Sequence, residues 1–478
     1  MRDALPPLVD ERLRALRARR IEPTEKGFGS LAAGGALTAA TLAADGPALH
    51  AAGFTYPLLT LRETALRDNI AAMADYCARA GVALAPHGKT AMSPELAALQ
   101  LAHGAWGITV ATIGQMQAYR AFGFPRLLLA NELVDRAGIA WLGAELAADP
   151  GFEAYCYVDS LDGVRILDQT LERHRFKGPG RRLPVLVEIG HAHGRTGCRT
   201  DEQALAVAKA ADATGTLAVA GVAGYEGSIG GDTEAQTLAR VAAFCRRLRD
   251  LGGAVAAAGP AEPIVTAGGS AYFDVVTREL TADGTAGLQV ILRSGAYLTY
   301  DHGFYGTVSP GGRGAPDAPA LRPALELWAQ VLSRPEPDLA LLGAGRRDAG
   351  FDKGLPMPLR VLPASPGGPC SPGGRPPGIP PILGGNRSPQ TPSAPSASLA
   401  PSASLAPSAP LAFSAPLGHI IELNDQHAYL RLAPGAALAP GDLVALGISH
   451  PCTTLDKWRV LVVVNDEGKV TDAVHAFF

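Results

Sequence analysis

The sequence has few of the features that mark secreted, membrane or nucleic-acid-binding proteins. Its six cysteines are scattered over 478 residues without a CxxC pair, so no disulfide framework is expected and reduced thiols in a cytoplasmic protein are predicted. Charge is nearly balanced, with 42 lysines and arginines against 45 acidic residues, so no basic face for nucleic acid is expected. The composition, 47% hydrophobic and 18% charged, suits a soluble globular enzyme.

A long uninterrupted hydrophobic run is also missing. Residues 31–54 are rich in alanine and glycine, but Asp45, Pro47 and His50 interrupt them, so no membrane span is expected. Residues 1–20 carry acids and many arginines without an apolar stretch, which argues against a secretory signal. We therefore expect neither a membrane nor nucleic acid as a partner.

Short apolar runs alternate with longer amphipathic stretches from Tyr56 to about Gly303. One such stretch, SPELAALQLAHG, has Ser93 as an N-cap, Pro94 at the first helical position and Gly104 as its stop. About eight or nine strand–helix units fit into roughly 250 residues, the usual length of a (β/α)8 barrel. An open doubly wound sheet is the alternative. The even repeat and the polar or glycine-rich loops after most strands favour the barrel, which we place at residues 51–305.

The second part of the chain, residues 306–478, has strand-like runs separated by turn residues and predicts an all-β domain. Inside it, residues from about 365 to 416 are dominated by proline, serine, glycine and alanine, so they are predicted to be a disordered insertion. Residues 1–50 form an N-terminal extension that we expect to pack on the β-domain.

Lys89, in the segment APHGKTAMSP, is the first candidate for chemistry. A lysine at a strand end most often extends its amine into solvent. Here Gly88 permits close approach of a ligand, and the nearly uncharged flanks would desolvate the amine and lower its pKa. Such a lysine can form a Schiff base with a carbonyl compound such as pyridoxal phosphate.

Two later strand ends, AGGS and RSGAY, could supply the backbone N–H groups that bind a phosphate. Each is weak evidence alone, because Gly-Ser loops are common turns. A third segment, GHAHGRTG, is ambiguous: its His-x-His pattern suggests a metal, and Arg195 suggests contact with an anion or cofactor.

His450 and Cys452 lie two residues apart in GISHPCTTLDKWR, so they project to the same side of an extended chain. Histidine and cysteine thiolate are good zinc ligands, and a pair of protein ligands leaves open positions for water or substrate. A turn with an incidental buried cysteine is the ordinary explanation of an isolated His-x-Cys. Asp425 and His427 are possible supporting groups.

The chain resembles the D-serine dehydratase and D-threonine aldolase family in four segments: PHGKT, SPELAALQLAHGAWGITVAT, LLLANELV and SHPCTTLDKWRV. Within that family, the sequence looks most similar to the amino acid deaminase, or D-serine deaminase-like, branch. The resemblance covers about residues 50–310 and 417–478. It implies an alanine-racemase-like barrel of fold type III, with pyridoxal 5'-phosphate and zinc, or another divalent metal, as cofactors. A second subunit commonly completes the pocket in this fold type, so a homodimer is expected.

The resemblance also implies roles for particular residues. Lys89 corresponds to the lysine that bonds to the cofactor, His450 and Cys452 to the zinc ligands, and Tyr225 to a tyrosine that contacts the pyridine nitrogen. This chain has YEGSIGG where the dehydratases continue with a histidine-rich run. The remaining predicted cofactor contacts lie in or beside the segments already quoted: His87, Arg195, Gly268, Gly269, Ser270, Ser294, Gly295 and Tyr297.

The implied reaction is a β-elimination that converts D-serine into pyruvate and ammonia. The alternative is a D-threonine aldolase, which cleaves its substrate to glycine and an aldehyde; the His-x-Cys pair favours the dehydratases because the aldolases more often have an acidic residue at the cysteine position. The metal pair argues against an amino acid racemase. The β-domain argues against a non-catalytic pyridoxal phosphate-binding protein, which is usually a bare barrel.

Overall fold

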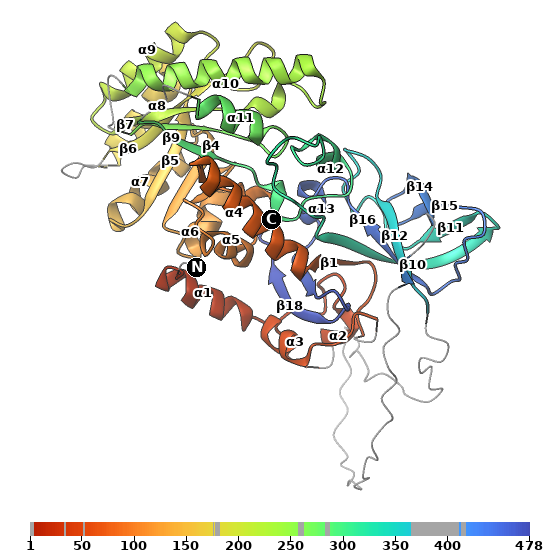
Figure 1. Cartoon of the computed structure of the whole chain (residues 1–478). Helices are drawn as coiled ribbons and strands as arrows, with labels where there is room; N and C mark the ends of the chain where they lie inside the picture. The colour runs from red at the N-terminus through yellow and green to blue at the C-terminus, as the bar shows by residue number, and fades with distance from the viewer. Residues whose placement is uncertain are drawn as a thin grey trace, which may run out of the picture.

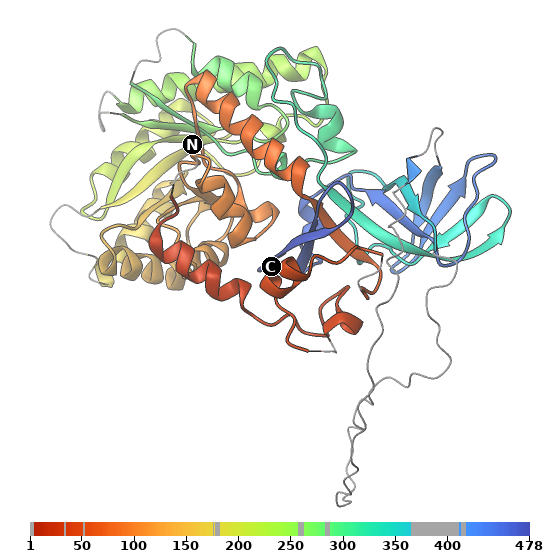
Figure 2. The same cartoon turned by 60° about the horizontal axis from the view of Figure 1, so that its bottom comes forward.

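A computed structural model describes residues 4–32, 35–50, 53–174, 176, 182–256, 262–282, 287–364, 411–412 and 417–478. It consists of an α/β barrel, a β-domain and N-terminal helices that run along one side of both (Figures 1 and 2). The five cysteines in the described part are free thiols. No helix among the described residues is long and apolar enough to span a membrane.

Eight parallel strands form the barrel, in the order β2-β9-β8-β7-β6-β5-β4-β3. A bridge between His87 and Thr109 joins the segment after β2 to β3, so the two ends of the sheet meet. The fold predicted from the sequence, a barrel of the (β/α)8 type with a separate β-domain, is therefore confirmed. The strands are β2 (Ala83–Leu84), β3 (Ile108–Val110), β4 (Arg126–Glu132), β5 (Glu153–Val158), β6 (Leu183–Ile189), β7 (Leu217–Gly224), β8 (Ile264–Ala267) and β9 (Gln289–Leu292).

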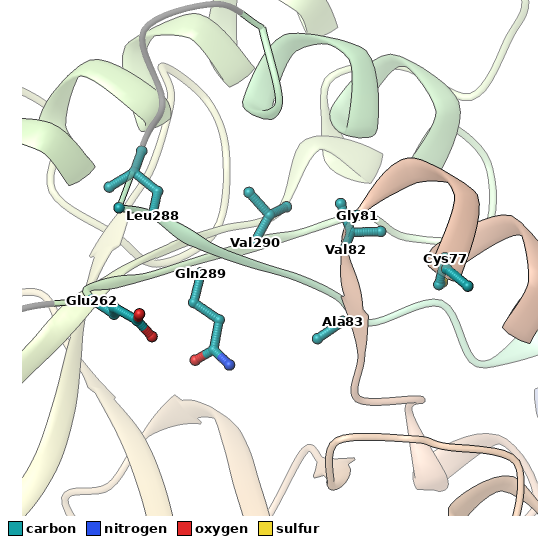
Figure 3. A pocket seen from close by; sticks show the side chains of 10 residues that line it. Cys77, Gly81, Val82, Ala83, Glu262, Leu288, Gln289 and Val290 are labelled. Atoms are coloured by element: carbon teal, nitrogen blue, oxygen red, sulfur yellow. The ribbon is translucent and has the colours of Figure 1, made fainter.

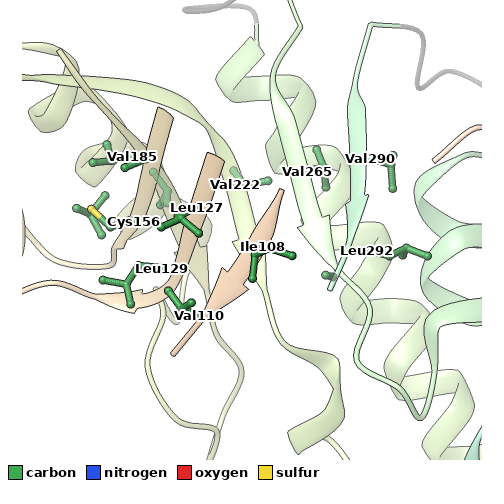
Figure 4. Packing of buried hydrophobic residues seen from close by; sticks show 14 of the residues in the cluster. Ile108, Val110, Leu127, Leu129, Cys156, Val185, Val222, Val265, Val290 and Leu292 are labelled. Carbon is green, nitrogen blue, oxygen red and sulfur yellow. The ribbon is translucent and has the colours of Figure 1, made fainter. Parts of the chain in front are cut away.

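Helices cover the outside of the barrel because strand residues alternate between two apolar environments. Leu127 and Leu129 of β4 pack with the surrounding helices (Figure 4), whereas Leu128 belongs to a small cluster with Tyr157 and Leu186 inside the barrel. The covering helices are α4 (Glu63–Ala80), α5 (Pro94–Leu101), α6 (Ile113–Ala121), α7 (Arg136–Ala148), α8 (Leu161–Arg173), α9 (Asp201–Asp212), α10 (Ala235–Ala256) and α11 (Phe273–Leu280). Helix α5 begins as expected, with the Ser93 hydroxyl accepting from the N–H of Leu96.

The β-domain is built on a sheet with the order β13-β12-β16-β10-β1-β17-β18, extended by β11, β14 and β15. Its strands are β1 (Leu58–Arg62), β10 (Leu325–Glu336), β11 (Leu339–Leu342), β12 (Met357–Leu362), β13 (Leu411–Ala412), β14 (Gly418–Leu423), β15 (Ala428–Leu432), β16 (Leu443–Gly447), β17 (Val460–Val464) and β18 (Val470–His475). The short helices α12 (Phe304–Val308) and α13 (Cys452–Leu455) lie beside it (Figure 1). The predicted insertion at about 365–416 falls outside the described residues, apart from 411–412.

Strand β1 corrects the barrel range given above as 51–305. It pairs with β10 and β17 and therefore belongs to the β-domain, and the barrel elements begin with α4. An apolar run such as LLTL is suited to any buried strand, and its partners lie more than 250 residues away in the sequence, so local pattern does not reveal its sheet.

The N-terminal extension contacts both parts of the molecule. Helix α1 (Pro7–Arg17) packs Val9, Leu13 and Leu16 into the same apolar cluster as the barrel helices. Helices α2 (Gly29–Ala32) and α3 (Ala39–Asp45) contribute to a second cluster, in which Phe28 packs with strands of the β-domain. The sequence-based expectation named only the β-domain as the surface to which this extension binds.

Candidate active site

A cavity of about 730 Å³ lies where the carboxyl ends of the barrel strands face the β-domain. Lys89 lines it from the barrel side, and His450 and Cys452 line it from the β-domain side. The structure brings nine of the predicted site residues to its wall: His87, Lys89, Arg195, Tyr225, Gly269, Ser270, Gly295, His450 and Cys452.

Lys89 sits in a single helical turn, Gly88–Thr90, that follows β2. The turn is packed tightly, because the Tyr119 hydroxyl donates to the Gly88 carbonyl at 2.9 Å and a Cβ on Gly88 would lie only 2.7 Å from that hydroxyl. Removal from bulk water lowers the pKa of the Lys89 amine, and Arg195 and Arg293 lower it further against the opposing Cys452 thiol. A larger fraction of Lys89 is therefore the neutral, nucleophilic amine.

The barrel end of the cavity carries unpaired polar atoms. The Nδ1 atom of His87 and the hydroxyl of Tyr157 are buried without a hydrogen-bond partner in the described part of the chain. Burial, together with nearby Lys89 and Arg293, holds the pKa of His87 well below its usual range, so this ring is neutral. Buried polar atoms of this kind normally have partners, which points to a polar ligand in the cavity.

Arg293 was missed among the predicted residues, although it directly follows the last barrel strand. Its Nη1 donates to the Thr266 hydroxyl at 2.7 Å and its Nη2 to the Gly224 carbonyl at 2.6 Å. These bonds hold a buried guanidinium at the cavity wall. Arg195, which also lines the cavity, stacks over the ring of Tyr225, 4.6 Å from its centroid. The wall therefore offers two positive charges to an anion.

Two loops form the predicted phosphate cradle, and one bond joins them: the N–H of Ala296 donates to the Ser270 hydroxyl at 3.1 Å. Gly295 has no room for a side chain, because a Cβ there would lie 2.6 Å from the His87 carbonyl oxygen. Two backbone N–H groups that were predicted to bind the phosphate have another partner. The N–H groups of Gly268 and Gly269 donate to the Glu226 carboxylate at 3.1 and 2.6 Å, so they are engaged within the protein.

Three predicted cofactor contacts do not line the cavity. Gly268 turns its backbone toward Glu226, and the Ser294 hydroxyl donates to the Gly268 carbonyl at 2.9 Å. Tyr297 points into the packed core, where its hydroxyl accepts from the Gln100 amide at 2.8 Å. All three are near the right loop, but neighbouring residues in a tight turn face different directions, which spacing does not resolve.

His450 and Cys452 lie at the β-domain side of the cavity. The Nδ1 atom of His450 contacts the Asp352 carboxylate at 2.7 Å, and the Thr453 hydroxyl donates to the other Asp352 oxygen at 2.7 Å. Burial disfavours a charge on His450, but hydrogen bonds to Cys452 and Asp352 outweigh it and raise the pKa of the ring. A carboxylate on one ring nitrogen leaves the other for a metal, as is usual for metal-binding histidines.

The predicted supporting groups of the metal pair are wrong. Asp425 forms a surface ion pair with Arg347, and neither Asp425 nor His427 lines the cavity. Asp352 has the supporting position, and its neighbour Lys353 lines the cavity with its amine 4.7 Å from the centroid of the Phe304 ring. No local signal in the sequence links Asp352 with His450, because the contact joins two loops 98 positions apart.

The β-domain contacts both the Lys89 turn and helix α5 of the barrel. The Cys452 thiol donates to the Thr90 hydroxyl at 3.4 Å. In helix α5, buried Glu95 accepts from the backbone N–H of His475 at 3.1 Å and contacts its Nδ1 atom at 2.9 Å. Distant parts of the sequence thus meet in one cavity.

A second cavity, of about 440 Å³, opens near the amino ends of β2 and β9 (Figure 3). Glu262 and Gln289 extend to one side of the strands there. No lysine, arginine or histidine occurs among its described lining residues, and burial raises the pKa of the Cys77 thiol to about 12. It offers neither an activated nucleophile nor an anion site, so the cavity at Lys89 is the candidate active site.

Comparison with known proteins agrees with this division of the chain. Residues 61–276 match the family described as "Alanine racemase, N-terminal domain", and residues 324–464 match "Putative serine dehydratase domain". The chain is 30% identical over 305 residues to a D-threonine aldolase of an Arthrobacter species, covering 63% of this chain and 74% of that protein. It is 28% identical over 315 residues to a 3-hydroxy-D-aspartate aldolase of Paracoccus denitrificans, covering 65% and 77%.

Solved structures show the same fold. The D-threonine aldolase from Filomicrobium marinum superposes with a TM-score of 0.67 at 21% identity, over 88% of this chain and 94% of that one. The D-threo-3-hydroxyaspartate dehydratase from Delftia sp. HT23 does so with a TM-score of 0.63 at 20% identity, over 88% and 97%. With both domains matched and most of the aldolase covered, the chain belongs to the serine dehydratase and D-threonine aldolase family of pyridoxal phosphate-dependent lyases.

Proposed function

We propose that this chain is a pyridoxal phosphate- and zinc-dependent dehydratase of β-hydroxy D-amino acids that converts D-serine into pyruvate and ammonia. The observation that carries the proposal is the joint cavity: Lys89 enters from the barrel, and His450 and Cys452 enter from the β-domain. A base for the Cα proton and a Lewis acid for the β-hydroxyl are the two groups that such an elimination uses at neutral pH.

The cavity suits both cofactors. Unpaired His87 Nδ1 and Tyr157 hydroxyl, the glycine loops, and the guanidinium groups of Arg195 and Arg293 offer polar and positive contacts for a phosphorylated pyridine. The nitrogen and sulfur donors of His450 and Cys452 suit zinc. One solved relative is described as a metal-free form of D-threo-3-hydroxyaspartate dehydratase, which implies that this relative binds a metal. When bound, pyridoxal phosphate supplies an electron-accepting ring, and zinc supplies a Lewis acid for a hydroxyl group.

The residues of the chain then have distinct tasks. The neutral amine of Lys89 accepts the proton from Cα, and the electron pair left at Cα forms the Cα–Cβ double bond as the β-hydroxyl leaves. The protonated amine of Lys89 returns that proton to the departing hydroxyl, which leaves as water. His450 and Cys452 would hold the zinc, with Asp352 orienting His450. The remaining enamine takes up one water and releases ammonia, so the water lost in the elimination is consumed again and D-serine gives pyruvate and ammonia.

A second candidate function is a D-threonine aldolase, favoured by the 28% and 30% identity to aldolases. In that reaction a base takes the proton of the β-hydroxyl, the Cα–Cβ bond breaks to release an aldehyde, and Cα takes up a proton to give glycine. Lys353, which lines the cavity beside Phe304, favours substrates with a negative side chain, such as D-3-hydroxyaspartate, in either reaction.

A substrate panel separates these reactions. Purified protein is incubated with D-serine, D-threonine and D-threo-3-hydroxyaspartate, and the products are identified by chromatography. A dehydratase gives 2-oxobutanoate from D-threonine, whereas an aldolase gives glycine and acetaldehyde. Lys353→Ala should raise KM for the hydroxyaspartate and leave KM for D-serine unchanged. Recovery of racemised substrate alone would exclude both candidates.

Lys89→Ala tests the common part of the two candidates. The visible absorbance of the bound cofactor should disappear, and turnover should fall by at least about 10²-fold because the acid–base group is lost. Lys457→Ala is the matched control, since that lysine pairs with Asp456 at 3.1 Å outside the cavity. Retained turnover in the Lys89 variant would contradict the proposal.

We also propose that the protein assembles as a homodimer. Light scattering measures the mass of the assembly in solution.

A further inference from the structure

Three carboxylates converge at the carboxyl ends of neighbouring barrel strands. Glu132 is the last residue of β4, Asp159 directly follows β5, and Glu188 lies near the end of β6. One oxygen from each side chain lies within 4.8 Å of the others. Adjacent parallel strands deliver these groups to one rim, so the cluster results from barrel topology and not from a chance surface contact.

The cluster is short of hydrogen-bond donors. Both carboxylate oxygens of Glu132 and one of Glu188 are buried without a partner in the described part of the chain. Glu188 itself is only 5% exposed. The carboxylate of Asp159 accepts a bond from the N–H of Gly197 at 3.0 Å. Buried carboxylates normally have partners, so these oxygens point to a missing ligand with positive charge or a proton.

Repulsion between these carboxylates indicates which kind of ligand the cluster requires. Oxygens of the three carboxylates lie within 4.8 Å of one another, so the groups repel one another strongly when all are ionised in this largely buried place. A proton shared between Glu132 and Glu188 would relieve part of the repulsion but would leave Asp159 unbalanced. A divalent cation neutralises two of the three negative charges and can take an oxygen donor from each carboxylate, because such an ion accepts oxygen ligands from several directions and favours ionised carboxylates.

A cation can reach the cluster through the active-site cavity. Glu188 and Asn131 line that cavity, so one member of the cluster and the residue next to Glu132 border its open space. Water molecules from the cavity would complete the coordination sphere, which hard cations usually keep. The nitrogen and sulfur donors of His450 and Cys452, by contrast, select a softer ion.

We propose that Glu132, Asp159 and Glu188 form a second metal site, for an oxygen-preferring divalent cation of the Mg²⁺, Mn²⁺ or Ca²⁺ class. The site joins the ends of β4, β5 and β6 and thereby fixes the wall that carries Tyr157. It does not depend on the proposed reaction, because its ligands, its metal class and its test are separate from those of the zinc pair.

The test uses Mn²⁺ as the probe and the full-length chain as the protein. A His450→Ala, Cys452→Ala background removes the other metal pair. After chelation and dialysis, Mn²⁺ binding is measured by electron paramagnetic resonance and by elemental analysis. We expect one tightly bound Mn²⁺ per chain, an increase in Tm with Mn²⁺, and competition by Mg²⁺ or Ca²⁺.

Two variants in that background give the decisive comparison. Glu132→Gln should weaken Mn²⁺ binding by at least tenfold and abolish the increase in Tm, and Glu188→Gln should do the same. Asp162→Asn is the control, since it removes one exposed carboxylate that pairs with Arg165. The proposal is overturned if the background protein binds no Mn²⁺, or if Glu132→Gln binds it as tightly as Asp162→Asn. Another outcome is that the background protein binds no Mn²⁺ and that Glu132→Gln raises Tm even without metal. This outcome would identify a proton shared between the carboxylates and would also overturn the proposal.

Discussion

Asp352 shows how a single carboxylate orients His450, the residue that we propose as a metal ligand. It holds the ring of His450 through Nδ1 and is itself held by the Thr453 hydroxyl. The orientation of His450 is therefore set before any metal arrives, which lowers the entropy cost of binding.

Replacing Asp352 with asparagine should weaken zinc binding by roughly 10- to 100-fold while the cofactor absorbance stays unchanged. Competition with a chromophoric chelator measures the zinc affinity. Asp456→Asn is the control, because Asp456 pairs with Lys457 away from the cavity. Equal zinc affinity in the two variants would show that Asp352 has no role in orienting His450.

At this scale the sequence identified the chemically unusual residues better than their neighbours. Lys89, His450 and Cys452 stood out because a desolvated lysine and a His-x-Cys pair are locally visible, and all three line one cavity. Asp352 was not visible, because its importance comes from a contact between loops distant in sequence. Tyr297 does not line the cavity, because one turn presents successive side chains to different sides.

The segment between the barrel and the β-domain contains a buried histidine that should make the stability of the protein depend on pH. Its His302 donates its backbone N–H to the Ile448 carbonyl at 2.9 Å, just after β16. Burial, and then the nearby guanidinium groups of Arg360 and Arg62, lower the pKa of His302 to about 4.

The folded protein therefore binds a proton at His302 more weakly than the unfolded chain does, so stability present above pH 6.5 is lost as the pH falls toward 4. The pKa difference corresponds to about 3 kcal/mol. His302→Gln should lose about that much less free energy of unfolding between pH 7 and pH 4, measured by urea titration. His50→Gln, at an exposed position, should behave like the parent; identical pH profiles for all three proteins would contradict the assignment.

The N-terminal extension contributes a second testable element. Phe28 is fully buried and packs edge to face with Phe54 at 5.6 Å between ring centroids. Phe28→Ala should reduce the free energy of unfolding by about 3–5 kcal/mol, the usual range for a buried phenylalanine. Leu205→Ala, at a 43% exposed position, is the control. A loss no larger than that of the control would mean that the extension does not stabilise the β-domain.

Individual helices and strands were easier to predict from the sequence than the sheet to which each strand belongs. Helix α5 was recognisable from Ser93 and Pro94, because caps act locally. Strand β1 was recognisable as a strand, yet it was assigned to the wrong sheet because its partners are far away in the chain.

On the scale of the whole molecule, the two proposed cofactors depend on different parts of the chain. Lys89, Arg293 and the glycine loops belong to the barrel, whereas His450, Cys452 and Asp352 belong to the β-domain. Loss of one cofactor should therefore leave the protein contacts of the other in place.

Chelation should abolish turnover of D-serine and leave the visible absorbance of the bound cofactor intact. Adding zinc back should restore turnover, because the barrel contacts of the other cofactor have not been disturbed. Absorbance and pyruvate release are measured on the same sample. Full turnover after verified metal removal would show that the reaction needs no metal at this site.

Strand β1 lies in the middle of a sheet whose other strands come from after residue 324, so the barrel is inserted within the β-domain along the chain. During synthesis, β1 leaves the ribosome long before its neighbours β10 and β17. One edge of β1 stays unpaired until β10 has emerged, and the other edge stays unpaired until β17 has emerged. The edge of β1 that faces β17 therefore waits longest for its partner, and a chain broken off before Val460, where β17 begins, would keep that edge unpaired.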